Sequence, residues 1–351
     1  MKHRLGEEIQ MRAAELIAPL TFRLIDMEIG DPEPGEVQVR VEAVGVCGSD
    51  MHAYTEGAVG GNANVYPMLL GHEPAGRILK TGAGVAGLAA GDRGALEPAL
   101  YCYHCEFCLS GHHNVCANIR FLSTPNHPGF FRELVNLPVA NFKPIPGEMS
   151  YGEAALAEPL AIAIHSLRLA SIGRGETVAV IGAGPIGLLT IAALRATGAG
   201  KIWSVEPLAH RRELARGIGA DVVLEPGEAL DEILKATGQR GVDCAIDCAA
   251  GEETTSQAMQ ITRNAGRVVL TGIHTSAFVK VDAGAMRRKE LTLFNVRRSN
   301  HETDEALELL GANAAWFAPL LTHTRNIDRI DEAFQIASQY RDGVGKMMIK
   351  P

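Results

Sequence analysis

Two groups of metal-ligating side chains lie in the first half of the sequence, and the more conspicuous is a four-cysteine loop. The stretch YCYHCEFCLSGHHNVC holds four cysteines with the spacing C-x2-C-x2-C-x7-C, namely Cys102, Cys105, Cys108 and Cys116. Four thiolates complete the tetrahedral shell of a structural zinc site and leave no open position for a substrate. The loop is therefore predicted to hold structural zinc, and His112 and His113 within it are expected to be exposed polar residues.

The second group is less conspicuous but better suited to chemistry. It consists of Cys47 in CGSDMH and His72 and Glu73 in GHE, and a further carboxylate, Glu158, follows in AEPLAIAIH. Thiolate, imidazole and carboxylate all suit zinc, and a catalytic zinc site uses about three protein ligands so that one position stays open for water or substrate. These residues are therefore predicted to form a catalytic zinc site.

A glycine-rich loop provides a predicted cofactor site. It has the pattern G-x-G-x-x-G between an apolar strand and a helix, and its residues are Gly182, Gly184, Pro185, Ile186 and Gly187. Such a loop lets the backbone approach a pyrophosphate at the helix N-terminus. Glu206, which ends the next strand, is placed to accept hydrogen bonds from the adenosine ribose and to repel a 2′-phosphate. NAD is therefore favoured over NADP, although Arg211 and Arg212 nearby leave NADP open.

The composition is that of a globular protein without nucleic-acid or membrane partners. The 351 residues suit two domains, with 46% apolar and 21% charged residues and a net charge of −8. A nucleic-acid surface would need clustered cations. The first residues lack the apolar segment of a secretory signal, and the apolar run at 178–194 contains glycines and a proline, which suit a strand, turn and helix. We expect a cytoplasmic protein.

The elements that position these groups are of two kinds. Residues 36–146 show short alternating strands and glycine-rich turns, whereas from about residue 176 strands and helices alternate in six units. Such alternation predicts an α/β fold with a parallel sheet covered on both faces. One of the predicted helices spans 254–266. After residue 301, two helical stretches precede a strand at the C-terminus, while residues 1–10 carry no assignment.

These motifs together resemble the zinc-dependent medium-chain dehydrogenase/reductase family over essentially the whole chain. The matching pieces are CGSDMH, LLGHEPAGRI, the four-cysteine loop, AEPLAIAIHSL, VAVIGAGPIGLL and IGAD. The resemblance implies a GroES-like β-rich catalytic domain at 11–152 with a structural zinc lobe at about 98–118. It further implies a Rossmann NAD-binding domain with a six-stranded doubly wound parallel sheet at 153–302, and a segment at 303–351 that returns to the catalytic domain. Relatives with the cysteine lobe are homo-oligomers, and a tetramer is favoured over a dimer.

The resemblance also implies roles for the second metal group. Cys47 and His72 match the family's catalytic zinc ligands. Glu158 stands where the alcohol dehydrogenase branch has a ligand cysteine, so the chain is similar instead to the polyol (sorbitol-like) and threonine dehydrogenase branches. In those branches Glu73 binds the metal or lies just behind it, while Glu158 contacts the metal, its water or the substrate. Which glutamate ligates zinc stays open.

A proton path is implied by the same resemblance. Ser49 takes the substrate proton, and His52 passes it to solvent through the cofactor ribose. Asp50 is expected to orient His72 from behind. The implied reaction is hydride transfer from a secondary alcohol to NAD.

The resemblance defines the substrate less precisely than it defines the reaction. Arg297 aligns with an arginine that polyol dehydrogenases point into the substrate pocket, but Ala53 replaces a tyrosine that lines this pocket in the sorbitol dehydrogenases of animals. The expected substrate is therefore a polyol or other alcohol of unspecified stereochemistry. An L-threonine-type amino-alcohol dehydrogenase is the alternative within enzymes. A non-catalytic zinc protein that senses NAD is the alternative of a different class.

Overall fold

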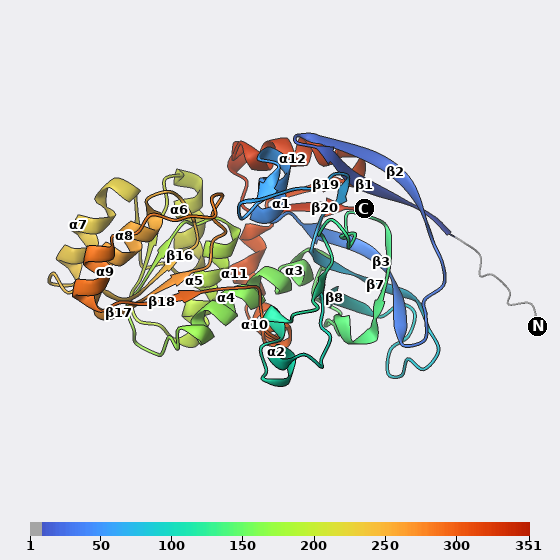
Figure 1. Cartoon of the computed structure of the whole chain (residues 1–351), viewed down its shortest axis with the longest axis horizontal. Helices are drawn as coiled ribbons and strands as arrows, with labels where there is room; N and C mark the ends of the chain where they lie inside the picture. The colour runs from blue at the N-terminus through green and yellow to red at the C-terminus, as the bar shows by residue number, and fades with distance from the viewer. Residues whose placement is uncertain (1–8) are drawn as a thin grey trace, which may run out of the picture.

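The computed structural model describes residues 9–351, which form an α/β part and a β-rich part side by side (Figure 1). The first strand of the β-rich part, β1, starts at Ile9, inside the stretch that carried no assignment. The candidate zinc and cofactor residues come from both parts, so the packing between them determines the site.

The α/β part contains a six-stranded parallel sheet with the order β15–β14–β13–β16–β17–β18. The strands are β13 (Val178–Ile181), β14 (Ile202–Val205), β15 (Val222–Leu224), β16 (Val242–Asp247), β17 (Thr262–Leu270) and β18 (Thr292–Asn295). This is the order 3-2-1-4-5-6 of a doubly wound dinucleotide-binding sheet, in which ligands bind where the strand order reverses. The predicted fold class is confirmed.

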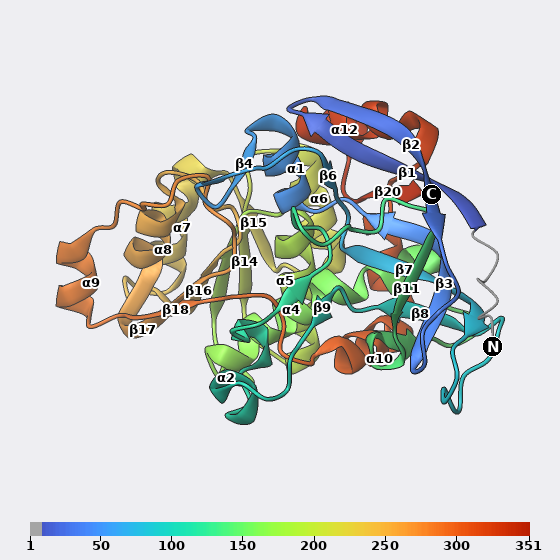
Figure 2. The same ribbon diagram turned by 45° about the vertical axis from the view of Figure 1, so that its right-hand side comes forward.

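Helices cover both faces of this sheet, as Figure 2 shows from a turned view. The helices are α4 (Ala157–Leu169), α5 (Pro185–Thr197), α6 (Ala209–Ile218), α7 (Pro226–Ala236), α8 (Thr254–Ile261) and α9 (Ala283–Lys289), and α10 (Thr303–Ala312) packs on α4. Successive side chains of β13 point to opposite faces of the sheet. Val178 and Val180 pack with α5 and α6, whereas Ala179 and Ile181 pack with α7 and α8. The sheet is thus buried on both sides, as its continuous apolar strands require.

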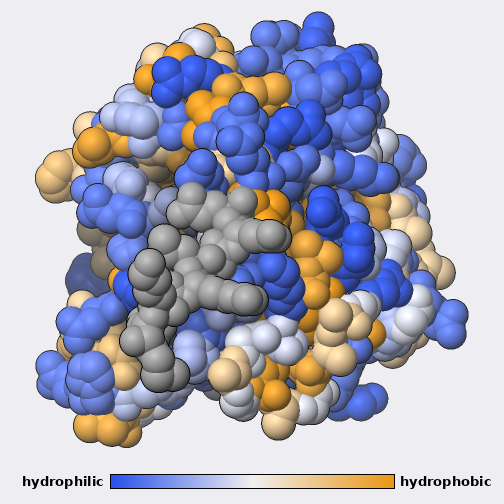
Figure 3. Space-filling view, turned by 90° about the vertical axis from the view of Figure 1, so that its right-hand side faces the viewer, coloured by the Kyte–Doolittle hydropathy of each residue, from blue (hydrophilic) through white to orange (hydrophobic). Residues whose placement is uncertain are grey.

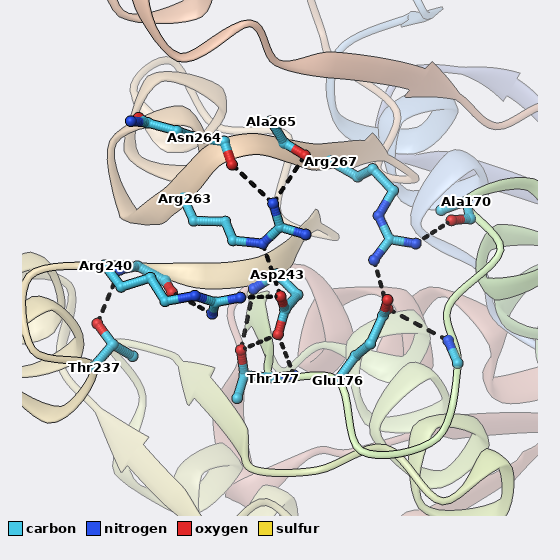
Figure 4. Close-up of polar contacts among 12 residues, drawn as sticks. Ala170, Glu176, Thr177, Thr237, Arg240, Asp243, Arg263, Asn264, Ala265 and Arg267 are labelled. Atoms are coloured by element: carbon cyan, nitrogen blue, oxygen red, sulfur yellow. Dashed lines mark hydrogen bonds and ion pairs between the residues drawn. The ribbon is translucent and has the colours of Figure 1, made fainter.

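The predicted helix at 254–266 is wrong in its second half, because α8 ends at Ile261 and β17 begins at Thr262. Thr262 adopts an extended backbone and pairs with Val242, while its hydroxyl donates to the Ala258 carbonyl of the last helical turn. The polar residues that follow are held in a turn, where the Arg263 side chain donates to the carbonyls of Asn264 and Ala265 (Figure 4).

Asp243 anchors this turn to the base of the sheet. Its carboxylate accepts hydrogen bonds from Thr177, Arg240 and Arg263 (Figure 4). Burial alone would raise the pKa of Asp243, but these hydrogen bonds hold it well below the usual range. These long-range contacts override the helical pattern of residues 262–266.

The β-rich part is built on a seven-stranded sheet with the order β12–β8–β7–β3–β20–β19, on which β11 also pairs with β3. The strands are β3 (Glu36–Gly45), β7 (Glu73–Thr81), β8 (Arg93–Leu96), β11 (Leu134–Pro138), β12 (Phe142–Pro144), β19 (His323–Asn326) and β20 (Met347–Lys350). A second sheet has the order β2–β1–β6, from Thr21–Ile29, Ile9–Ala18 and Met68–Leu69. The C-terminal strand β20 thus lies beside β3, far from it in sequence.

Figure 3 views the molecule from its β-rich end and shows mainly hydrophilic residues with small apolar areas between them. Within residues 9–351, no helix has the length and apolar character that crossing a membrane requires.

Candidate active site

Cys47, His72 and Glu73 meet where two chain segments converge. Cys47 is the N-cap of α1 (Gly48–Thr55), and His72 directly precedes Glu73, the first residue of β7. One ligand atom of each residue lies within 4.8 Å of the others. Thiolate, imidazole and carboxylate at such separations fit a zinc ion, and three ligands leave a coordination position for substrate.

Asp50 fixes two of these residues from behind. Its carboxylate accepts hydrogen bonds from the backbone N–H groups of Cys47 at 3.1 Å and Gly71 at 3.4 Å, and its Oδ1 lies 3.4 Å from His72 Nδ1. Burial would lower the pKa of His72, but Asp50 and Cys47 raise it well above its usual value. The contact between Asp50 and His72 is the one that orients a metal-binding imidazole.

Lys346 completes the surroundings of Glu73, and the sequence analysis missed it. Its ammonium forms an ion pair with Glu73 Oε2 and donates to the Val46 carbonyl at 3.0 Å, and both Lys346 and Glu73 are only 1% exposed. A Cβ atom on Gly45 would lie 2.0 Å from Glu73 Oε2, so only glycine leaves room for the pair. A lysine directly before the apolar terminal strand was the available signal, since a buried lysine is rare without a partner.

Glu158 lies beside this group rather than within its closest set of ligand atoms. It belongs to the first turn of α4 and lines a small hollow together with Glu97, Tyr101, Phe121, Arg298 and Ser299. Burial, opposed by His72 and helped by the charge of Glu73, raises the pKa of Glu158 to about 7. A second buried glutamate thus interacts electrostatically with two of the three candidate ligands.

Ser49 and His52 both lie on α1, at different distances from the metal ligands. The Ser49 hydroxyl is 3.4 Å from His72 Nε2, whereas His52 Nδ1 lies 2.8 Å from a carboxylate oxygen of Glu56. The side chain of His52 is partly exposed. The helix therefore places a hydroxyl at the site and a titratable imidazole toward solvent.

The four cysteines of the second metal group form a compact cluster. The Sγ atoms lie 3.9 Å apart for Cys102 and Cys108, 3.9 Å for Cys105 and Cys116, and 3.4 Å for Cys116 and Cys102. A tetrahedron with Zn–S bonds of about 2.3 Å places its sulfur atoms about 3.8 Å apart. The backbone N–H groups of His104 and Cys105 lower the pKa of Cys102 to about 5, which favours the ligating thiolate. The cluster fits zinc and has no room for substrate.

The four-cysteine loop is docked onto the segment at 297–302. His112 is exposed as expected, but the expectation for His113 is wrong, because its ring packs edge-on against His301 with centroids 4.5 Å apart. The His113 backbone N–H donates to Asn300 Oδ1, and Asn300 donates back to the Gly111 carbonyl. Because these partners are distant in sequence, no local sequence pattern predicts that His113 packs against His301.

The glycine loop and Glu206 lie together at the C-terminal ends of β13 and β14. Gly182 has a φ of +88°, and a Cβ on Gly187 would lie 1.9 Å from the Gly182 carbonyl oxygen, so both positions require glycine. Glu206 is 3% exposed and accepts hydrogen bonds from the backbone N–H groups of Ala183 at 2.7 Å and Leu208 at 3.0 Å. Pro185 opens α5, with Ile186 next to it, directly after the loop.

Two arginines follow Glu206 on α6. The guanidinium of Arg211 lies 4.6 Å from the centroid of the Tyr340 ring, close to Gly184. Arg212 donates to the carbonyls of Glu206 and Pro207 and pairs with Glu225. The donors of Arg212 are thus occupied by protein groups, whereas Arg211 lies beside the glycine loop.

Arg297 and Arg298 occupy different environments. The side chain of Arg297 is exposed, and its carbonyl accepts a hydrogen bond from Asn114 Nδ2. It is Arg298 that lines the hollow with Glu158, with its guanidinium 4.0 Å from the centroid of the Phe121 ring. Adjacent arginines in one motif cannot be distinguished by sequence spacing alone, because the backbone turn between them decides which one enters the hollow.

Comparisons with known proteins agree with this architecture. Residues 33–147 match the family model described as an alcohol dehydrogenase GroES-like domain, and residues 185–312 match the model described as a zinc-binding dehydrogenase. A sorbitol dehydrogenase of Bacillus subtilis is 32% identical over 345 residues, covering 97% of each chain. An L-idonate 5-dehydrogenase of Vitis vinifera is 32% identical over 342 residues, covering 95% of this chain and 93% of that protein.

Solved structures extend the similarity to three dimensions. An alcohol dehydrogenase from Escherichia coli CFT073 complexed with NADH has a TM-score of 0.88 at 28% identity, over 97% of this chain and 99% of that one. A zinc-binding dehydrogenase from Sinorhizobium meliloti bound to NADP has a TM-score of 0.88 at 28% identity, over 98% and 100%. With two family models and full-length relatives in agreement, the chain belongs to the zinc-dependent medium-chain dehydrogenase/reductase family.

Proposed function

We propose that the chain is a zinc-dependent, NAD-linked polyol dehydrogenase that oxidises a secondary hydroxyl of a sugar alcohol or related polyol to a ketone. The observation that carries this proposal is the group Cys47, His72 and Glu73, whose ligand atoms lie within 4.8 Å of one another, together with the buried carboxylate of Glu158, which interacts electrostatically with His72 and Glu73. Carboxylates there suit a substrate with several hydroxyl groups. The similarity to proteins named sorbitol dehydrogenase and L-idonate 5-dehydrogenase supports the same class.

The proposed roles follow from the positions of the side chains. Cys47, His72 and Glu73 or Glu158 would hold a zinc ion, which lowers the pKa of the substrate hydroxyl as a Lewis acid. Ser49, beside His72, accepts the hydroxyl proton, and His52 passes it to solvent. Gly182, Gly184, Gly187 and Glu206 would hold the dinucleotide, which would supply the hydride acceptor. Four thiolates hold a second zinc that stabilises the lobe.

The preference for NAD provides the first prediction. The Glu206 carboxylate beside the glycine loop repels a 2′-phosphate, so kcat/KM with NAD is expected to exceed that with NADP by about tenfold or more. Glu206→Ser should reduce this ratio through a gain with NADP, because Arg211 remains nearby to bind the phosphate. Steady-state kinetics with both cofactors measure the ratio. Equal or better turnover of the wild type with NADP would exclude the preference.

The reaction class is tested by a substrate panel. Purified protein is assayed for NADH formation with a set of polyols, simple alcohols and L-threonine, and its zinc content is measured in parallel. Oxidation of polyols is expected to dominate, with about two zinc ions per chain. Turnover of L-threonine in preference to every polyol would favour the amino-alcohol alternative, and failure to reduce NAD with any alcohol would favour an NAD-sensing protein.

We further propose the domain division 11–152, 153–302 and 303–351, a cytoplasmic location and a homotetrameric assembly. The division is supported by β20, which joins the sheet of the first segment. A reducing compartment is supported by the seven cysteines, all of which are free of disulfides.

A further inference from the structure

Arg298 is a cation in the small hollow beside Glu158, and its hydrogen-bond donors have no partner among the residues that the structure describes. Its guanidinium lies flat enough on Phe121 to bring Cζ within 4.0 Å of the ring centroid, and it lines the hollow beside Glu158. Among residues 9–351, it makes no hydrogen bond and no ion pair, although Glu158 and Tyr101 act on it electrostatically. Guanidinium groups packed on a ring keep their N–H fork free for a planar anion.

The backbone holds this side chain in place. Arg298 has a φ of +55°, a left-handed conformation that non-glycine residues adopt only when their surroundings enforce it. The four-cysteine lobe supplies that enforcement on both sides, because Asn114 donates to the Arg297 carbonyl at 2.9 Å and the His113 N–H donates to Asn300 Oδ1 at 3.1 Å. The guanidinium is therefore presented to the hollow in advance of any ligand.

The charges around Arg298 leave it without a close counterion. Within the described part of the chain, no carboxylate oxygen lies within 4.0 Å of a nitrogen of Arg298, and Glu158, which lines the same hollow, acts on it only at longer range. Burial and the neighbouring charge of Arg297 lower the pKa of Arg298 to about 10, against the opposing effects of Glu158 and Tyr101. Glu97 and Glu158 line the same hollow, but neither forms an ion pair with Arg298. An anionic group would both pair with the guanidinium and occupy its donors, which a neutral polyol cannot do.

We propose that Arg298 binds an anionic group on the substrate, so that the preferred substrate is a polyol that carries a terminal carboxylate or phosphate. The reacting hydroxyl is placed at Cys47, His72 and Glu73, and the anionic end at Arg298. This inference rests on the proposed polyol dehydrogenase function and narrows its substrate class. Carboxylate and phosphate share the chemistry that a guanidinium fork recognises, and the experiment separates them.

The test compares three compounds that share the same carbon chain and differ only in the group at one end. The neutral polyol that the wild-type enzyme oxidises best is compared with the corresponding aldonic acid and the terminal phosphate ester. Each is measured as a substrate through KM or as a competitive inhibitor of the polyol through Ki. At least one anion is expected to bind about tenfold more tightly than the neutral polyol, and the more effective one identifies the group.

Substitution of Arg298 provides the second arm. Arg298→Met is expected to weaken binding of the preferred anion by about tenfold or more and of the neutral polyol by less than about threefold, with zinc content and thermal unfolding unchanged. Arg298→Lys should retain part of the advantage. Arg120→Met is the matched control, because Arg120 is exposed next to Phe121 and its loss removes the same charge. It is expected to change neither affinity by more than about twofold.

Two results would overturn the inference and leave the proposed function intact. One is binding of the neutral polyol as tightly as both anions, and the other is equal weakening of all three compounds by Arg298→Met. Absence of oxidation of every polyol would instead overturn the proposed function, and the inference with it. The wild-type panel therefore tells the two failures apart.

Discussion

Cys47→Ser is expected to lose the catalytic zinc and to lower kcat/KM by about a thousandfold or more, while the chain stays folded. A factor of that size corresponds to the several kcal/mol of charge stabilisation that a metal Lewis acid supplies. Serine has nearly the size of cysteine and is a favourable N-cap residue, so α1 should keep its start at this position. Zinc analysis should show a fall from about two to about one ion per chain.

Cys105→Ser is the matched control, because it also removes one thiolate ligand but from the four-cysteine cluster. It is expected to lose the other zinc and to lower the thermal midpoint, while the fraction that remains folded still oxidises polyols. The assignment of the two metal sites fails if Cys47→Ser keeps substantial turnover. It fails equally if Cys105→Ser abolishes the reaction in a chain that is folded as well as the wild type.

Lys346→Met is expected to lower the free energy of unfolding of the zinc-free protein by about 3–5 kcal/mol, the cost of leaving a buried charge without its partner. Glu73 is 1% exposed, and Lys346 is its ion-pair partner. Methionine fills a similar volume without charge, so packing changes little. Urea denaturation of the zinc-free protein measures the loss, which should shrink in zinc-loaded protein because the metal then serves as the counterion of Glu73.

The double variant with Glu73→Gln separates the charge from the packing. If the ion pair is the cause, Glu73→Gln should recover much of the stability lost in Lys346→Met, and the double-mutant cycle should give a coupling energy above about 1 kcal/mol. Additive effects of the two substitutions would show that the lysine acts through packing alone.

The parts of the molecule that follow local patterns could be predicted from the sequence. The alternating strands and helices of the sheet, the glycine loop and the cysteine spacing each depend on neighbours within a few turns of chain. The grouping of Cys47, His72 and Glu73 could also be predicted, since residue type and the family's motifs both point to them, and the structure brings their ligand atoms within 4.8 Å of one another.

The remaining features depend on contacts that no local pattern encodes. Lys346 reaches Glu73 only because β20 pairs with β3, and Arg298 replaces Arg297 in the hollow because its backbone is left-handed. The end of α8 at Ile261 depends on Asp243, which draws Arg263 toward the base of the sheet. In each case a partner from another segment decides between two local conformations that the sequence allows.

The pairing of β20 with β3 also has a consequence for the order in which the molecule can form. The α/β sheet takes all its strands from one continuous stretch, Val178–Asn295, whereas β3 must wait for residues about 300 positions later. Loop closure over such a distance is slow, and a growing chain emerges from the ribosome with its C-terminus last. The cation that neutralises Glu73 is therefore the last part of the metal site to be synthesised, and a chain that stops before Lys346 has a buried carboxylate with no lysine to balance it.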